Sequence, residues 1–309
     1  MKKVFFYVDD VIWVYRDLTR QKPKSMFDNE YMKMLKKAHE DYGFKVQLNS
    51  FYRTDFFYGS DEFTLSDMTD AYKDEWRENA DWLKIGFHAK QEFPDYPYVN
   101  GEYEYVKKDY NEIFDEVRRF ASEENIGRSC TPHWSVISRD GARALRDCGV
   151  TVLTAIDGGK RFEFNGDKSS LPYGHYGRYI QNKKPETMLF TRDTKDKAIR
   201  CSLCSYNCIS QNDMEKTEFK LKTFYDSDMD LHLKCLNNTG ALNLITLDEI
   251  EEKYEKHLDE EYIGAMTHEQ YFYKDYFAYQ PDYAEKIYKM AEYLTQNGFE
   301  FFFAHELSE

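Results

Sequence analysis

The feature that most constrains the fold is a regular alternation of apolar strands with amphipathic helices along nearly the whole chain. Short runs rich in Val, Ile and Phe, such as 4–8 and 44–51, are followed by stretches whose apolar residues recur at helical spacing. Strands that are separated by helices pair in parallel through right-handed crossovers. We therefore expect an α/β protein built as a distorted parallel (β/α)7-type barrel.

The expected elements follow one another in a regular order. Strands are expected at 4–8, 44–51, 82–89, 126–134, 150–156, 262–268 and 299–305, and helices from about 25 to 43 and at 66–82, 103–124, 138–149 and 281–297. The stretch at about 160–240 is less regular, with turns rich in Gly, Lys and Asn. Since the alternation resumes after it, we expect a single domain over 1–309 that carries this stretch as an irregular insertion.

The charge of the chain limits its partners. The formal net charge of −14 repels phosphate backbones and anionic lipid surfaces, so we expect neither nucleic acid nor membrane as a partner. The apolar N-terminal run ends at Asp9 and Asp10, too early for a membrane span or a secretory signal, so we expect a cytoplasmic protein. Aromatic residues make up 17% of the chain, and those that do not fill the core suit a carbohydrate partner, because their rings stack on sugar faces.

Three cysteines lie close together in RCSLCSYNC, at Cys201, Cys204 and Cys208. A metal clip with Cys235 is one interpretation, but a structural zinc ribbon normally shows two separated cysteine pairs. In a chain without an export signal, we expect reduced thiols instead.

Polar side chains follow the expected strands at the end where parallel barrels carry their active sites. These are Asp9, Asp10, His88, His133, Asp157, His268 and Glu269. Each one alone is compatible with an ordinary polar residue at the start of a loop, but adjacent carboxylates such as Asp9 and Asp10 are costly to bury unless a cation or a proton separates them. Together they predict a divalent metal site, with zinc favoured and cobalt or nickel as alternatives.

Some of these residues stand in motifs that resemble a known family. The string FFYVDD, which ends at Asp9 and Asp10, resembles the first motif of the polysaccharide deacetylases of carbohydrate esterase family 4. That resemblance implies that Asp9 is the catalytic base and that Asp10 binds the metal. GFHAKQE resembles the second motif and implies His88 as a ligand, but Glu92 stands where the family has a second His.

Two further segments extend the resemblance. RSCTPHWS lies where the family has an Arg-x-Pro segment, with Arg128 as the counterpart of the catalytic arginine and His133 as a substitute metal ligand. The third ligand is therefore either Glu92 or His133. IGAMTHEQYF resembles the last motif and implies that His268 protonates the leaving group.

The resemblance implies a metal-dependent hydrolase that removes an acetyl group from a carbohydrate through metal-activated water. Trp134, Asp157 and Tyr176 are the expected substrate-binding residues, with Tyr176 in a Gly-rich loop where an aromatic side chain can close over a sugar.

Two other functions are compatible with the same residues. One is a catalytically silent barrel that binds a glycan through its aromatic mouth. The other is a glycoside hydrolase that uses paired carboxylates such as Asp10 and Asp157. A bound metal would favour the deacetylase, whereas carboxylates that face each other across a groove would favour the glycoside hydrolase.

Overall fold

The computed structural model describes residues 2–54, 62–92, 97–98, 101–133, 136–156, 178–180, 223–226, 229–237 and 239–308. Its strands are β1 (Lys2–Val11), β2 (Val46–Phe51), β3 (Leu83–Ala89), β4 (Ser129–Cys130), β5 (Val136–Ser138), β6 (Val152–Ile156), β7 (Arg178–Ile180), β8 (Thr223–Asp226), β9 (Leu231–Asn237), β10 (Tyr262–His268) and β11 (Phe299–Phe302). Its α-helices are α1 (Trp13–Gln21), α2 (Glu30–Tyr42), α3 (Lys73–Glu78), α4 (Tyr103–Phe120), α5 (Arg139–Asp147), α7 (Ile250–Glu255) and α8 (Tyr283–Gln296).

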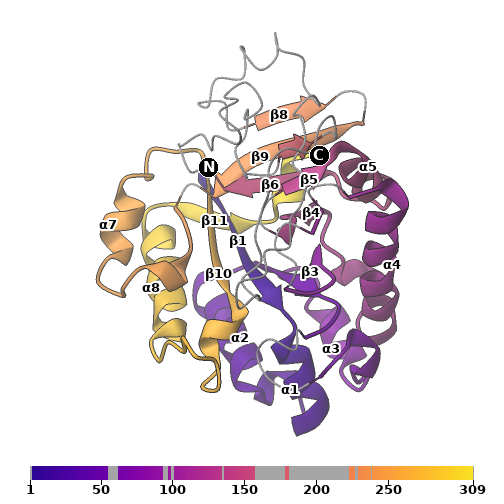
Figure 1. Ribbon diagram of the computed structural model, residues 1–309. Helices are drawn as coiled ribbons and strands as arrows, with labels where there is room; N and C mark the ends of the chain where they lie inside the picture. Colours follow the sequence, from indigo (N-terminus) through magenta and orange to yellow (C-terminus); the bar gives the residue numbers. More distant parts are fainter. Residues whose placement is uncertain are drawn as a thin grey trace.

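Strand β1 is the centre of the largest sheet. It pairs in parallel with β10 along one edge, while β11 and β2 share its other edge, and β3 continues the sheet beyond β2. A second sheet has the order β4-β6-β9-β8, and β5 pairs with β7. Helices flank these strands, with α7 and α8 on one side and α4 and α5 on the opposite side (Figure 1).

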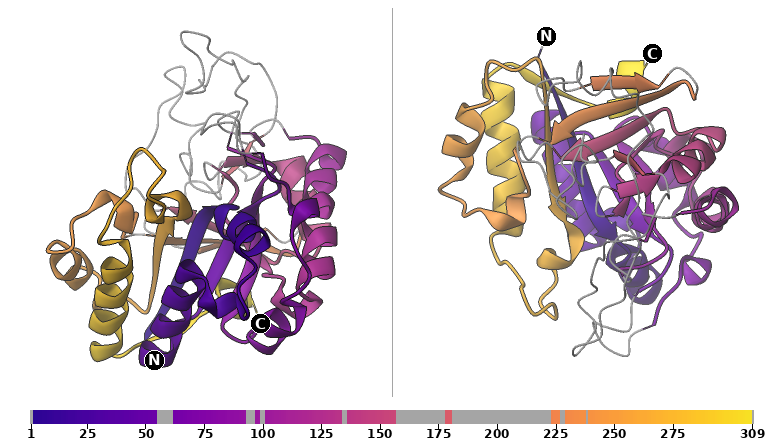
Figure 2. Two further views of the ribbon diagram at one scale, coloured as in Figure 1. Left: turned by 90° about the horizontal axis from the view of Figure 1, so that it is seen from below. Right: turned by 45° about the horizontal axis from the view of Figure 1, so that its top comes forward.

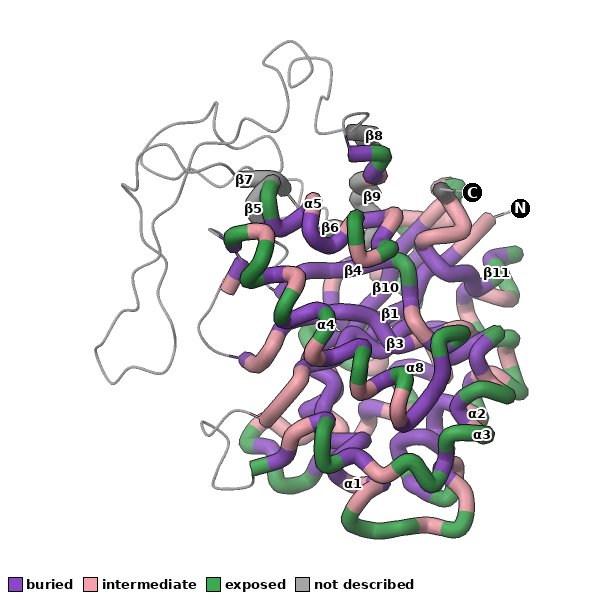
Figure 3. Tube along the Cα trace, turned by 90° about the vertical axis from the view of Figure 1, so that its right-hand side faces the viewer, coloured by how far each residue is buried: buried purple, intermediate pink, exposed green. Residues whose placement is uncertain are grey.

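The two faces of β1 show why an apolar strand of this kind is buried. Val4, Phe6 and Val8 pack into the large core that the helices cover. Phe5 and Tyr7 point the other way, into a second cluster of buried residues that also contains Val152, Met266 and Phe302. Successive side chains of a strand alternate between faces, so both faces of β1 are covered and its sequence is apolar from Val4 to Val8. In Figure 3, buried residues dominate the strands and the exposed ones lie mainly on the helices and their connections.

The α/β class and the parallel pairing that the sequence predicts are confirmed. A closed barrel is not shown, because the described strands form separate sheets that isolated parallel bridges connect, Ile85 to Ile126 and Ala241 to Met266. One pair departs from the expected parallel order, since β8 runs antiparallel to β9. Strand β9, which the sequence placed in the irregular insertion, pairs in parallel with β6 as an ordinary strand of the second sheet.

The helices differ from expectation at three places. The helix expected from 25 to 43 is divided into a short 3-10 turn, η1 (Met26–Asp28), and α2, and the helix expected at 66–82 is reduced to η3 (Leu65–Asp67) and α3. The sequence did not predict α1, which begins directly after β1. The other 3-10 turns are η4 (Glu123–Asn125), η7 (Leu242–Leu244), η8 (Glu269–Phe272) and η9 (Ala304–Ser308).

Helices α7 and α8 lie side by side at one flank of the sheet (Figure 2). In the described part of the chain, no helix combines the length and the apolar character needed to cross a bilayer.

Candidate functional site

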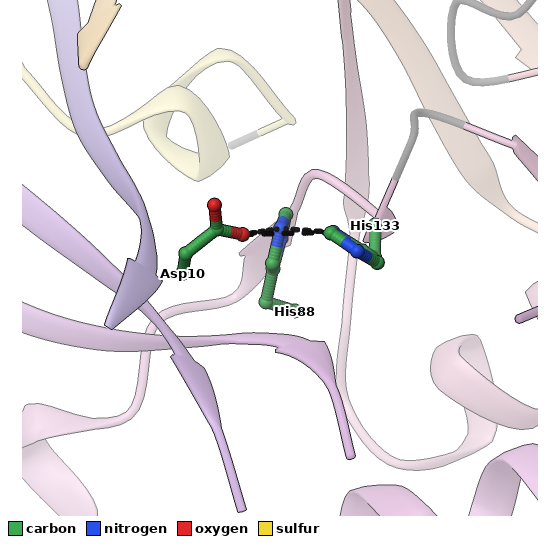
Figure 4. A group of neighbouring side chains, drawn as sticks. All are labelled: Asp10, His88 and His133. Atoms are coloured by element: carbon green, nitrogen blue, oxygen red, sulfur yellow. Dashed lines mark hydrogen bonds and ion pairs between the residues drawn. The ribbon is translucent and has the colours of Figure 1, made fainter. Parts of the chain in front are cut away.

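The polar residues that end β1, β3 and β10 meet at one end of the large sheet. The parallel register places Asp9 of β1 opposite His268 of β10, and His88 is the last residue but one of β3. The segment that follows β4 brings in His133. Figure 4 shows Asp10, His88 and His133 pointing toward one another. The C-terminal ends of parallel strands thus form the candidate site, as they do in other α/β folds.

Asp9 and Asp10 both reach the same imidazole although they are neighbours in a strand. Consecutive residues of a regular strand point to opposite faces. At the end of β1, however, the pairing with β2 shifts register between Val8 and Val11, and Asp10 has a left-handed backbone with φ of 63°. Asp9 Oδ1 lies 3.6 Å from His88 Nδ1, and Asp10 Oδ1 lies 3.1 Å from His88 Nε2. A bulge of this kind re-aims a side chain, and here it directs two carboxylates to one point.

Backbone carbonyls fix the tautomers of the two histidines. His88 Nδ1 lies 2.8 Å from the carbonyl oxygen of Thr131, and His133 Nε2 lies 2.9 Å from that of Glu92. A carbonyl oxygen only accepts hydrogen bonds, so these two nitrogens carry the protons of the neutral rings. The other two nitrogens, His88 Nε2 and His133 Nδ1, then face each other at 2.9 Å with their lone pairs.

Three lone pairs therefore converge in this group. Asp10 Oδ1 lies 3.1 Å from His88 Nε2 and 3.6 Å from His133 Nδ1. Two bare imidazole nitrogens and a carboxylate oxygen repel one another unless a proton or a metal ion lies among them. The three side chains are buried, and their ligand atoms all lie within 4.8 Å of one another. Asp10, His88 and His133 therefore form a group that could bind a metal ion.

Burial and the neighbouring charges shift the titration of these groups in different directions. Burial alone would lower the pKa of His88, but the carboxylates of Asp9 and Asp10 outweigh it and raise that pKa. Burial, assisted by the charge of His88, lowers the pKa of His133 to about 3. Burial raises the pKa of Asp9, whereas for Asp10 the opposing effect of burial is outweighed by the histidines and the pKa falls. The carboxylates thus favour an additional proton on His88, whereas the lowered pKa of His133 disfavours one there.

A chain of buried amides holds Asp9 from behind. Ser129 Oγ donates to Gln47 Oε1 at 2.7 Å, so the amide nitrogen of Gln47 must face Asn49 Oδ1, which it reaches at 2.7 Å. Asn49 Nδ2 in turn donates to Asp9 Oδ1 at 2.7 Å. Because each bond fixes the orientation of the next amide, the chain presents an N–H donor to Asp9.

Two glycines make room for this amide chain. A Cβ on Gly86 would lie 2.9 Å from Gln47 Cδ and closer still to Asn49 Oδ1. A Cβ on Gly127 would lie 2.5 Å from Gln47 Oε1. Since real Cβ atoms do not come that close, any larger residue at either position would displace the buried amides.

Glu269 has a structural task at the same end of the sheet. Its carboxylate accepts hydrogen bonds from the backbone N–H groups of Ile12, Trp13 and Val14 at 2.7, 2.8 and 2.7 Å. These are the donors that the start of α1 leaves unpaired, and Ile12 has no side chain that could cap them. Burial raises the pKa of Glu269 to about 7, against the effect of these hydrogen bonds. The residue after His268 thus ties β10 to the helix that follows Asp10.

A small pocket adjoins Asp10. Its lining consists of Asp10, Ile12, Trp13, Phe51, Thr54, Glu92 and Gln270, and its volume of about 10 Å³ gives room for about one water molecule. Gln270 Nε2 donates to Asp10 Oδ2 at 2.9 Å, while Asp10 Oδ1 faces the histidines. Asp10 Oδ1 therefore belongs to the group that could bind a metal ion, while Asp10 Oδ2 lies on the side of the pocket.

The structure brings together most, but not all, of the residues that the sequence singled out. Asp9, Asp10, His88 and His133 are buried in one cluster, and His268 lies at its edge with Nδ1 at 3.0 Å from Asn243 Oδ1. The metal-ligating group that the described residues form contains His133, while the side chain of Glu92 lines the pocket.

Arg128 lies apart from the other predicted site residues that the structure describes. It is exposed and precedes β4, whereas His133 follows that strand, so the two lie at opposite ends of it. The segment RSCTPHWS contains the whole of β4, and a strand separates residues that are close in sequence. Trp134, Asp157 and Tyr176, as well as Cys201, Cys204 and Cys208, lie outside the described residues.

Sequence reasoning missed Gln47, Asn49 and Gln270. A signal for the first two was present, because Gln47 and Asn49 stand two apart in the apolar strand FKVQLNSF and so share one face of it. For Gln270 no local pattern gave a signal, since its partner Asp10 is 260 residues away.

Comparisons with known proteins show the fold and leave the family open. No family model matches the chain, and no curated protein matches it. Among solved structures it is similar to a 4-alpha-glucanotransferase from Thermococcus litoralis, with a TM-score of 0.54 and 11% identity. The match covers 100% of this chain and 40% of that chain, so this chain spans less than half the length of its neighbour. The similarity extends over all of the chain's α/β fold.

The expected deacetylase function is contradicted by this comparison. The structural neighbour is named for glucan transfer, and no family model supports the resemblance of the short motifs to polysaccharide deacetylases. The removal of an acetyl group by zinc-activated water is therefore not supported, and neither is zinc as the particular metal. The glycoside hydrolase that the sequence offered as an alternative agrees better with the fold.

Proposed function

We propose that this chain is a carbohydrate-active enzyme that acts on glycosidic bonds through the carboxyl groups of Asp10 and Glu92. The observation that carries the proposal is that two acidic residues from different segments, Asp10 at the end of β1 and Glu92 after β3, line the same pocket. Enzymes that cleave glycosidic bonds commonly use such a pair of carboxyl groups. The similarity of the fold to that of a 4-alpha-glucanotransferase supports the same reaction class.

The pair differs from the one that the sequence suggested. Asp157 was the expected partner of Asp10, and it lies outside the described residues. Glu92 takes its place in the proposal because its side chain is buried and lines the pocket with Asp10. The buried side chains of Trp13 and Phe51 form apolar walls of the same pocket.

The two carboxyl groups have different tasks in this proposal. Asp10 is the charged carboxylate that stabilises the positive charge which develops on the sugar. Asp10 keeps its negative charge because Gln270 donates a hydrogen bond to Oδ2 and the imidazole of His88 lies beside Oδ1. Glu92 donates the proton to the leaving oxygen as the glycosidic bond breaks, and it then takes a proton from the water or sugar hydroxyl group that forms the new bond to the anomeric carbon. Asn49 fixes Asp9, which lies on the far side of His88 from Asp10 and keeps that ring in place.

A divalent metal ion fits the group of Asp10, His88 and His133, because three lone pairs converge there and backbone carbonyls fix both tautomers. When bound, such an ion would supply positive charge that attracts sugar hydroxyl groups. Asp10 can serve both sites, since its Oδ1 faces the histidines and its Oδ2 accepts from Gln270.

The leaving group of the substrate tests these roles. The purified protein is incubated with α- and β-linked oligosaccharides and with the corresponding nitrophenyl glycosides, whose leaving group needs no proton. We expect Glu92→Gln to lose activity on the oligosaccharides by about 10²-fold or more and to keep most of its activity on the nitrophenyl glycosides. Asp10→Asn should lose both activities.

Glu78→Gln is the matched control, because Glu78 is an exposed residue at the end of α3 and is not among the residues that line the pocket. Equal losses of Glu92→Gln on both kinds of substrate would show that Glu92 is not the proton donor. A wild-type protein that binds the sugars but leaves every linkage intact would instead support the silent glycan-binding function.

A further inference from the structure

Gln270 carries a buried acceptor whose direction is fixed. Its side chain is 6% exposed, and its amide Nε2 donates to Asp10 Oδ2 at 2.9 Å. A carboxylate oxygen accepts this bond, so the amide cannot be turned around without placing two acceptors against each other. Gln270 Oε1 must therefore face away from Asp10 Oδ2. Among the described residues it has no hydrogen-bond partner.

The pocket that Gln270 lines is rich in hydrogen-bond acceptors. Asp10 and Glu92 contribute carboxylates to its lining. Thr54 also lines it, but the hydroxyl of Thr54 is engaged with Phe63, accepting from its N–H at 2.9 Å and donating to its carbonyl at 3.3 Å. A buried acceptor without a donor is unfavourable, so this lining calls for a ligand group that donates hydrogen bonds.

The size of the pocket limits that group. Its volume of about 10 Å³ is enough for one water molecule or one hydroxyl group. Ile12, Trp13 and Phe51 form its apolar walls. A single hydroxyl group that projects from a sugar satisfies both the size of the pocket and its need for a donor, because the hydroxyl enters while the ring stays outside.

We propose that this pocket receives a single hydroxyl group of the bound sugar and that Gln270 Oε1 accepts a hydrogen bond from it. This inference rests on the proposed function and goes further by naming the residue that selects the substrate. The same amide holds Asp10 through Nε2, so recognition of the hydroxyl and orientation of the carboxylate depend on one side chain. Sites that hydrogen-bond a substrate hydroxyl discriminate strongly against analogues that lack it, because the buried acceptor is then left unpaired.

The test compares maltose with its monodeoxy analogues. Their dissociation constants are measured by calorimetry for the wild type, Gln270→Met and the control Gln296→Met, which changes an exposed glutamine of α8. In the wild type, removal of one particular hydroxyl should weaken binding about tenfold or more. Gln270→Met should bind that analogue and maltose equally well, while Gln296→Met should keep the preference of the wild type for maltose.

The outcomes separate the inference from the proposed function. If the wild type binds none of the sugars, both are overturned. If it binds maltose and Gln270→Met shows the same pattern of deoxy losses as the wild type, only the assignment of Gln270 is overturned. A crystal structure with maltose bound elsewhere and a water kept in the pocket would also overturn it, since the acceptor would then serve a structural water.

Discussion

Substitution of Gly86 by Ala tests whether the buried amide chain behind Asp9 is as tightly packed as the structure shows. The added Cβ would lie 2.9 Å from Gln47 Cδ and closer to Asn49 Oδ1, and neither residue has exposed surface into which it can move. Overpacking of a core costs about 1–3 kcal/mol. Breaking the 2.7 Å bond between Gln47 and Asn49 leaves buried polar atoms unpaired and costs roughly another 1–3 kcal/mol.

We therefore expect Gly86→Ala to lower the free energy of unfolding by about 4 kcal/mol. For a chain of 309 residues this corresponds to a fall in Tm of about 6 °C, measured by differential scanning calorimetry. Gly43→Ala is the control, because a Cβ there meets nothing within 4 Å and the φ of +64° alone costs only about 1 kcal/mol.

The double variant Gly86→Ala with Asn49→Ala separates the clash from other effects. Since it removes one of the two side chains that the new Cβ meets, its loss of stability should be smaller than the sum of the two single losses. A Gly86→Ala protein that melts within 1 °C of the wild type would refute the tight packing of these amides.

Three other predictions follow from the site. Glu269→Ala removes the acceptor of three buried N–H groups at the start of α1 and should lower the unfolding free energy by about 3–5 kcal/mol in urea titrations, and a loss below about 1 kcal/mol would contradict this role. A divalent metal ion added to metal-free protein should raise its Tm, and more at pH 8 than at pH 5.5. The raised pKa of His88 means that a proton competes with the metal ion for this ring at the lower pH. Thermal scans measure the rise in Tm, and His133→Ala should abolish it. An equal rise in Tm at both pH values would contradict competition between the proton and the metal ion. Arg128→Ala should leave activity on glycosides unchanged, because Arg128 precedes β4 and is exposed, and a loss of tenfold or more in kcat/KM would return it to the site.

The sequence predicted those parts of the fold whose signal is local. Strand β1 is apolar on both faces and β3 ends in a histidine, and both elements were expected nearly where they lie. Helix α1 was missed because its unpaired N–H groups are satisfied by Glu269, which is more than 250 residues away and cannot be read from the neighbouring sequence.

The candidate site was predicted at the level of residue types but not of geometry. The polar residues at strand ends indicated Asp9, Asp10, His88 and His133, since parallel strands gather their C-terminal ends. The tautomers of the two histidines depend on carbonyl groups of Thr131 and Glu92, and no sequence pattern reports which carbonyl a ring will face. The same holds for Gln270, whose task follows from a contact and not from a motif.

Product analysis on maltooligosaccharides tests the central claim most directly. The wild type and Asp10→Asn are each incubated with a maltooligosaccharide of single length, and the chain lengths are followed by chromatography. We expect the wild type to produce chains of other lengths and Asp10→Asn to leave the starting sugar unchanged. Redistribution by Asp10→Asn at the wild-type rate would contradict the claim that the carboxylate at the end of β1 acts on the glycosidic bond.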